Sequence, residues 1–205
     1  MVLDDNWYTE ASHDLGLGFS LRIKSKLHEE QSAYQTIAVY ETETFGRLLT
    51  IDGLVMLTDR DNFVYHEMMT HPALFTHRNP KKVVIIGGGD CGTLKEVLKH
   101  PGVEEAWQVE IDERVTQVSE KYFPELSESN RDPRANFFFG DGIQPVENFI
   151  YREVFACALC FFACCQAAGD ECFLAFPHMD LLANRRFHEG GQRFAIAQYP
   201  FGGFT

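Results

Sequence analysis

Apolar and polar side chains alternate along much of the first sixty residues, with the two-residue period of strands that bury one face. The runs with this pattern are 19–27, 34–42, 47–51 and 54–57. Asp52-Gly53, between the last two runs, favours a two-residue hairpin turn. The pattern predicts a small antiparallel β domain. Its core is too small to be stable alone, so we expect it to pack on the residues that follow or on a second subunit.

Residues 59–77 continue with a helical pattern. Thr58 or Asp59 is expected to cap this helix, and Pro72 to kink or divide it. The expected apolar stripe consists of Phe63, Met68 or Met69, and Leu74.

The polar segment 79–82 contains a proline and is the expected linker to the second domain. The chain is therefore predicted to consist of a β domain with its following helix at 1–78 and a second domain at 79–205.

In the second domain, short apolar runs alternate with helical segments, which is typical of an α/β fold with a parallel sheet. Strands are expected at 83–86, 105–112 and 135–139, and helices at 93–100 and 113–123; 124–134 is expected to be a loop. The first strand, Val83-Val84-Ile85-Ile86, is aliphatic at every position, as in a strand buried on both faces.

A glycine turn follows this strand, because Gly87, Gly89 and Gly92 have the G-x-G-x-x-G spacing between a strand and a helix. Such a turn lies where nucleotide-like ligands bind. Asp90 inside it would repel a pyrophosphate by roughly 1–4 kcal/mol at about 4 Å. The turn therefore favours a ligand without phosphate, preferably a cationic one.

Acids also end the next two expected strands. Glu110 lies 21 residues after Gly89, where a carboxylate can accept hydrogen bonds from both ribose hydroxyls. The alternative, that an acid caps the following helix, fits Asp112 better than Glu110. The third strand ends in Gly140-Asp141-Gly142. Because parallel strands end at one edge of a sheet, these acids should lie close together.

The composition of the chain limits the classes of partner that it is expected to bind. The 205 residues carry a formal net charge of −12, which argues against nucleic acid and anionic membranes as partners. The charge is compatible with a cationic substrate, but acidity that serves solubility alone explains it more readily. The N-terminus lacks the apolar core of a signal peptide, and the apolar run 154–165 is too short to span a bilayer, so a cytoplasmic location is expected.

Of the six cysteines, Cys91 stands alone and five lie between 157 and 172. Without a secretory signal they are expected to be reduced thiols. Cys157 and Cys160 have metal-ligand spacing, but no second pair follows, so no metal site is predicted there.

From about Trp7 to Gly142 the chain resembles the polyamine aminopropyltransferases, the spermidine synthase family. Two stretches are the most specific, DRDNFVYHEMMTH at 59–71 and VIIGGGDCG at 84–92. The others are 32–35, 45–47, 49–53, 109–112, 132–134 and 140–142. The resemblance implies a small N-terminal antiparallel β domain before a Rossmann-like domain of the AdoMet-methyltransferase type, assembled as a homodimer or homotetramer.

The resemblance also implies a reaction, the transfer of an aminopropyl group from decarboxylated S-adenosylmethionine to putrescine, giving spermidine and 5′-methylthioadenosine without a cofactor. The residues that it implies for the nucleoside are Gln35, Gly87, Gly89, Glu110, Asp141 and Gly142, with Glu110 on the ribose and Asp141 toward the adenine. It implies that Asp90 holds a substrate ammonium and that His66, with Tyr65, lines the amine channel. Considered alone, the stretch around His66 favours a packing histidine over a functional one.

Residues 143–205 depart from the family pattern. The family has a fourth strand that ends in an Asp-Ser/Cys-Thr-Asp-Pro turn, whose first aspartate accepts the proton, and no such turn occurs here. No catalytic residue is therefore identified, and the Rossmann-like domain is expected to be incomplete. A shifted reading frame or a mispredicted gene end is the hypothesis for this segment, and 154–162 is apolar enough to supply a substitute fourth strand.

Three functions remain open on these grounds. The first is an aminopropyltransferase, which as this polypeptide is expected to turn over little or not at all. The second is an AdoMet-dependent methyltransferase or an NAD-dependent oxidoreductase, against which Asp90 and the helix carrying His66 argue. The third is a non-catalytic truncated subunit that binds methylthioadenosine or associates with a full-length partner.

Overall fold

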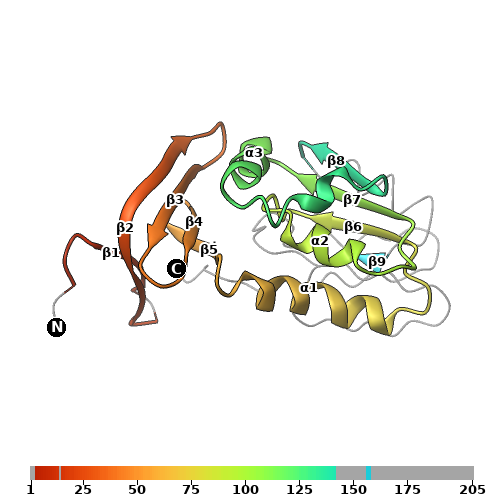
Figure 1. Ribbon diagram of the computed structural model, residues 1–205, viewed down its shortest axis with the longest axis horizontal. Coiled ribbons are helices and arrows are strands. Elements are labelled where there is room, and N and C mark those ends of the chain that lie inside the picture. Colours follow the sequence, from red (N-terminus) through yellow and green to blue (C-terminus); the bar gives the residue numbers. More distant parts are fainter. Residues whose placement is uncertain (1–2, 14, 142–155, 158–205) are drawn as a thin grey trace, which may run out of the picture.

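The computed structural model describes residues 3–13, 15–141 and 156–157. Two sheets follow one another along the chain, an antiparallel sheet at the left of Figure 1 and a parallel sheet at its right, with helix α1 leading from one to the other. The expected fold class, a small N-terminal antiparallel β domain followed by a Rossmann-like α/β domain, is confirmed.

The N-terminal sheet has the strand order β1-β2-β3-β4-β5, and all neighbouring strands are antiparallel. The strands are β1 (Trp7–Ser12), β2 (Leu17–Gln31), β3 (Thr36–Thr42), β4 (Arg47–Ile51) and β5 (Leu54–Thr58). β2 is longer than the alternating run predicted. It pairs with β1 over its first part and with β3 over its second part, so its length connects the edge strand to the rest of the sheet.

The hairpin between β4 and β5 forms where the sequence predicted it. Asp52 has φ +49° and Gly53 has φ +79°, so both central residues adopt the left-handed conformation of a type I′ turn. The side chain of Asp52 also accepts a hydrogen bond of 2.8 Å from the backbone N–H of Thr36, which fixes the turn against β3.

Helix α1 (Asn62–Thr76) begins later than predicted and is capped differently. Its N-cap residue is Asp61, without a side-chain cap hydrogen bond, so the prediction of Thr58 or Asp59 as cap is wrong. The backbone carbonyls of those two residues instead accept hydrogen bonds from the side chain of Asn62, which closes the first turn from inside the helix. The helix is also continuous across Pro72, so the expected division does not occur.

The apolar stripe predicted for α1 is partly wrong. Leu74 is buried, and so is Met69, the second of the two methionines offered as alternatives, but Phe63 is more than half exposed. The buried face is completed by His66 and Thr70, two polar residues that a hydrophobic pattern does not register. The helix therefore buries two polar groups beside its apolar ones.

The second sheet has the order β8-β7-β6-β9, and every pair in it is parallel. Its strands are β6 (Lys82–Ile86), β7 (Glu105–Glu110), β8 (Ala135–Phe139) and the two-residue β9 (Ala156–Cys157). Its helices are α2 (Gly92–Leu98) and α3 (Glu113–Tyr122), and the expected loop before β8 contains the short 3₁₀ helix η1 (Glu128–Arg131). β9 lies within the apolar stretch that the sequence proposed as a substitute fourth strand.

One core cluster lies between the parallel sheet and helices α1 and α2. It combines the aliphatic residues of β6 with Met69 and Leu74 of α1 and Leu94 and Val97 of α2. A second cluster joins the N-terminal sheet to α3, with Ile37, Leu49, Val115, Val118 and Phe123 among its members. In Figure 1, α3 accordingly lies beside β3 at the junction of the two sheets. The two parts of the chain thus share a buried interface, as the small size of the β domain required.

Gly142 and residues 143–205, which depart from the family pattern, lie outside the described residues apart from β9. The predicted linker at 79–82 overlaps the start of β6, and the proposed boundary between 78 and 79 stays a prediction. In the described part of the chain, no helix is long and apolar enough to cross a membrane.

Candidate functional site

The glycine turn after β6 has the conformation that its spacing predicted. Gly87 and Gly88 have φ values of +77° and +73°, which residues with a side chain rarely adopt. The N–H of Gly87 donates a hydrogen bond of 2.8 Å to the carbonyl of Val109 in β7. The fully buried Gln108 donates from Nε2 to the carbonyl of Gly88 at 2.6 Å. The neighbouring strand therefore holds the turn from two positions.

Position 89 requires glycine because the side chains of Glu110 and Val115 lie close to its Cα, and not because of its backbone angles. A Cβ there would lie 3.0 Å from Glu110 Oε2 and 2.9 Å from Val115 Cγ1. Without that Cβ, the Gly89 N–H donates a hydrogen bond of 3.0 Å to Glu110 Oε2. The other oxygen, Oε1, accepts one of 3.0 Å from the N–H of Asp112. The structure thus brings Gly89 and Glu110 together, as the 21-residue separation suggested.

Glu110 is 7% exposed and held by backbone N–H groups. Burial raises the pKa of its carboxyl group above the ordinary value, and the hydrogen bonds from the backbone offset only part of that effect. Each carboxylate oxygen has more than one lone pair, so both oxygens can still accept hydrogen bonds from hydroxyl groups of a ligand.

On the α2 side of the turn, Asp90 faces His66 of α1. Asp90 Oδ1 accepts a hydrogen bond of 2.7 Å from the N–H of Gly92 and lies 2.9 Å from His66 Nε2. His66 is 1% exposed, and a Cβ at position 92 would overlap its ring. The last glycine of the motif therefore makes room for the histidine that contacts the acid of the same motif.

Burial by itself would raise the pKa of Asp90, but the charge and contact of His66 and the N–H of Gly92 outweigh it and lower the pKa below the ordinary value. Asp90 therefore remains an anion in a partly buried position. Such a group suits the binding of an ammonium.

Gln35 reaches the site from the turn between β2 and β3. Its Nε2 donates a hydrogen bond of 3.0 Å to Asp112 Oδ2, which also accepts one of 2.6 Å from the hydroxyl of Ser32. Asp112 caps α3 through a hydrogen bond from the N–H of Arg114, as its position after β7 predicted. Gln35 therefore contacts Asp112, whose N–H in turn donates to Glu110, and this contact connects the β domain to the parallel sheet.

Asp141 follows β8 and is exposed. The N–H of Gly140 donates a hydrogen bond of 2.9 Å to the backbone carbonyl of Glu110, so the ends of β7 and β8 are adjacent. The prediction that the acids of neighbouring strands meet at one edge therefore holds for the backbone positions of Glu110 and Asp141.

Tyr65 is 40% exposed, and its ring meets that of His66 edge-on at 5.3 Å between centroids. It also lines a mainly apolar cavity of about 490 Å³ between β5 and α1, together with Phe19, Leu57 and Met68. Tyr65 therefore connects this cavity with His66.

Three features escaped the sequence prediction. Gln108 supports the glycine turn from a buried strand position, and a polar residue in an apolar strand was the available signal. Ser32 donates a hydrogen bond to Asp112, which lies 80 residues later in the chain, and no local pattern indicates such a contact. Cys91 has φ +69°, a strained angle for a residue with a side chain, and burial raises the pKa of its thiol to about 12, so it is an unreactive packing residue.

The parallel sheet with its glycine turn, preceded by a separate antiparallel sheet, defines a Rossmann-like α/β protein of the AdoMet-methyltransferase type with an N-terminal β domain. Residues 6–59 match the family described as the spermidine synthase tetramerisation domain, and residues 62–158 match the spermine/spermidine synthase domain. The chain belongs to the spermine/spermidine synthase family.

Relatives and solved structures agree with that membership. The chain is 63% identical over 148 residues to the polyamine aminopropyltransferase of Alkalilimnicola ehrlichii, and 65% identical over 145 residues to that of Nitrosococcus oceani; these matches cover 72% and 70% of the chain. The chain spans about half the length of these relatives, 52% and 51%.

Spermidine synthase from Thermotoga maritima is similar in structure, with a TM-score of 0.68 and 39% identity over 71% of this chain and 52% of that one. A spermidine synthase solved in complex with the transition state analogue AdoDATO has the same TM-score and identity, over 71% of this chain and 50% of that one. Both likenesses cover only about half of the neighbours' length.

Proposed function

We propose that this chain supplies the nucleoside-binding half, and part of the amine-binding half, of a spermidine synthase. The reaction would transfer the aminopropyl group of decarboxylated S-adenosylmethionine to putrescine, with spermidine and 5′-methylthioadenosine as products and no cofactor. The observation that carries the proposal is the meeting of Glu110, Asp90 and His66 around one glycine turn. The family and the names of its relatives supply the substrate class.

The nucleoside is assigned to the β7 side of the turn. Glu110 would accept hydrogen bonds from the two ribose hydroxyls through the lone pairs that the N–H groups of Gly89 and Asp112 leave free. Gly87 and Gly89 would let the sugar approach the backbone, because neither has a side chain. Asp141, with Gly142 beside it in the sequence, would face the adenine amino group. Gln35 would contribute from the β domain.

The amines are assigned to the α2 side. Asp90 stays anionic beside His66 and would hold an ammonium of either substrate. Tyr65 would line the approach, since it contacts both His66 and the apolar cavity, whose walls suit the methylene chain of a diamine.

The chemistry needs one nucleophilic amine and one base. The amine nitrogen attacks the methylene carbon bonded to the sulfonium, so a C–N bond forms while the C–S bond breaks. The electron pair of that bond goes to sulfur, which becomes a neutral thioether. The amine loses a proton, because an amine with a pKa near 10 is protonated at neutral pH until a base takes that proton. None of the described residues is assigned as that base.

Calorimetry with methylthioadenosine, paired with a putrescine-dependent turnover assay, tests the proposal. Binding with turnover supports the full reaction. Binding without turnover supports a nucleoside-binding subunit that lacks its base. A preference for NADH over methylthioadenosine would contradict both. A chain that methylates an acceptor with S-adenosylmethionine would belong to the methyltransferase alternative.

A homo-oligomer, dimeric or tetrameric, and a cytoplasmic location are part of the same proposal. The match of residues 6–59 to a tetramerisation domain supports self-association through the β domain. Sedimentation equilibrium would distinguish the two assemblies, and a concentration-independent monomer would exclude both.

A further inference from the structure

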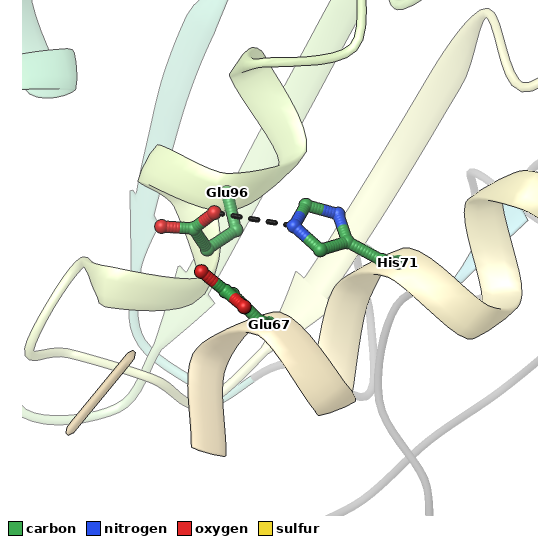
Figure 2. A group of neighbouring side chains, drawn as sticks. All are labelled: Glu67, His71 and Glu96. Carbon is green, nitrogen blue, oxygen red and sulfur yellow. Dashed lines mark ion pairs between the residues drawn. The ribbon is translucent and has the colours of Figure 1, made fainter. Parts of the chain in front are cut away.

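Two helices present the same pair of metal-binding side-chain types to each other. Glu67 and His71 lie four residues apart on α1, and Glu96 and His100 lie four apart on α2 and just beyond its end. A spacing of four puts both members of each pair on one face of a helix. Figure 2 shows Glu67 and His71 directed from α1 toward Glu96 on α2. One donor atom from each of these three residues lies within 4.8 Å of the others.

The carboxylate of Glu96 gives independent support for a cation at this place. Glu96 is only 4% exposed, and its buried Oε2 lies 3.3 Å from His71 Nε2 within the cluster and 2.6 Å from the ammonium of Lys99. A second carboxylate, that of Glu67, lies beside it. Two adjacent carboxylates, one of them buried, repel each other unless a positive charge lies between them.

The distance between His71 and Glu96 suits a shared metal ion. His71 Nε2 lies 3.3 Å from Glu96 Oε2. Two ligands at about 2.0–2.1 Å from a tetrahedral zinc ion are about 3.3 Å apart. Glu67 is only partly buried, so a change of rotamer can bring its carboxylate to the same distance.

The ring of His71 is oriented by a second histidine. Its Nδ1 is hydrogen-bonded to His100 Nε2 at 2.9 Å. The ring of Phe75 packs against that of His100, with 4.9 Å between centroids. When Nδ1 donates this hydrogen bond, the lone pair of Nε2 points toward Glu96. Histidines that bind metals are commonly oriented in this way, through a hydrogen bond from the nitrogen that does not bind the ion.

We propose that Glu67, His71 and Glu96 form a site for a divalent transition metal, with Zn²⁺ as the expected ion, that clips α1 to α2. One imidazole and two carboxylates suit zinc, and water would complete the coordination. The site lies one residue from His66 along α1 but uses none of the groups assigned to the nucleoside or the amines. Its expected role is to fix α1 against the parallel sheet.

Lys99 is the cation that the metal must displace. Its Nζ lies 2.7 Å from Glu96 Oε1 and 2.6 Å from Oε2. The side chain of Lys99 is 51% exposed, so the ammonium can move into solvent when an ion binds. Lys99 therefore lowers the affinity of the site, and its removal should raise it.

Calorimetric titration of Zn²⁺ into the chelator-treated chain measures the site. We expect one ion per chain at this site, affinity at least tenfold weaker in Glu67→Gln and in His71→Asn, and affinity severalfold tighter in Lys99→Met. The matched controls are Glu113→Gln and His28→Asn, which change the same residue types elsewhere and should leave the affinity unchanged. Unchanged affinity in both Glu67→Gln and His71→Asn would overturn the proposal, as would the absence of binding to the parent chain.

The cysteines require a second measurement, because thiolates also bind zinc. With Co²⁺ as probe, a Glu-His-Glu site gives no thiolate-to-cobalt charge-transfer absorption, whereas cysteine ligation does. A cobalt spectrum free of that band and lost in His71→Asn supports the site; a thiolate band that persists in His71→Asn assigns the ion to cysteine and overturns it. Neither measurement uses nucleoside or amine, so its result is independent of the proposed reaction.

Discussion

At the carboxyl edge of the parallel sheet, Glu110 receives hydrogen bonds from the backbone N–H groups of Gly89 and Asp112, whereas Asp90 faces the buried ring of His66. Both acids are shielded from water, yet their pKa values move in opposite directions, up for Glu110 and down for Asp90. Backbone N–H groups alone offset only part of the cost of burying the Glu110 carboxylate, while a facing histidine and a backbone N–H together more than offset it for Asp90.

This difference separates two kinds of carboxylate around one glycine turn. A carboxylate held by N–H groups has a fixed orientation and spare lone pairs, which suits the hydroxyls of a neutral sugar. A carboxylate kept anionic beside a histidine suits a charged amine. A ligand that joins a nucleoside to an aminopropyl sulfonium needs both kinds.

The largest expected effect comes from Gly92→Ala. The added Cβ would overlap the His66 ring, which is 1% exposed. We expect a loss of about 3 kcal/mol in the free energy of unfolding, at the upper end for overpacking, measured by urea denaturation. Gly102→Ala is the control, because a Cβ there meets nothing within 4 Å. A loss no larger than in that control would show that His66 does not pack on Gly92.

Second in size is the contrast between Glu110→Gln and Asp90→Asn in calorimetry with methylthioadenosine. Glu110→Gln should weaken binding at least tenfold, or about 1.4 kcal/mol, because it removes a ribose acceptor and turns an amide donor toward a backbone N–H. Asp90→Asn should leave that affinity within about threefold, because methylthioadenosine has no amine tail. Equal losses in the two variants would remove the distinction between the two acids.

The next largest effect is expected in the pH dependence of stability, which should distinguish Asp90 from Glu110. Asp90 has a lowered pKa when folded, so it contributes stability above its ordinary pKa of about 3.9, and that contribution disappears as the pH falls through the folded value. Glu110 has a raised pKa, so its contribution is present below its ordinary value of about 4.3 and disappears as the pH rises through the folded value.

Urea unfolding between pH 3 and pH 7 should therefore show opposite changes in the two variants. Asp90→Asn should flatten the acid side of the stability curve, and Glu110→Gln should steepen it. Curves that change in the same direction would mean that the environments of the two acids do not differ as described.

The smallest effect on stability is expected from removing an ion pair at the surface, the one between Arg114 and Glu30. Arg114 contacts both carboxylate oxygens of Glu30 at 2.7 Å and joins α3 to β2, but its side chain is 48% exposed. Arg114→Ala should shift the urea midpoint only slightly, and high salt should abolish the difference, because water and salt screen such pairs. A shift as large as that of Gly92→Ala would indicate a role for this pair in docking the β domain.

Much of the fold was predictable because its signals are local. The Asp52-Gly53 turn, the aliphatic strand β6 and the glycine spacing each depend on the conformation or burial of a few adjacent residues. Helix α1 was predicted less well, because its N-cap residue is Asp61, its first turn is closed by the side chain of Asn62, and its buried face includes His66. A hydrophobic pattern cannot anticipate a histidine that is buried to meet an acid.

By itself the sequence determined the order of the strands and helices from β2 to β8, although not the edge strand β1, and it determined the glycine turn and the acids at the ends of three strands. These follow from side-chain period, glycine conformation and the parallel arrangement of the sheet. It also carried the family resemblance, because the matching stretches are short and contiguous.

Only the tertiary structure decided which groups stand against each acid. His66 reaches Asp90 from α1, Ser32 and Gln35 reach Asp112 from the β domain, and Glu67, His71 and Glu96 meet across two helices. These contacts join residues far apart in the chain, and their energies depend on distance and burial, which no local pattern contains.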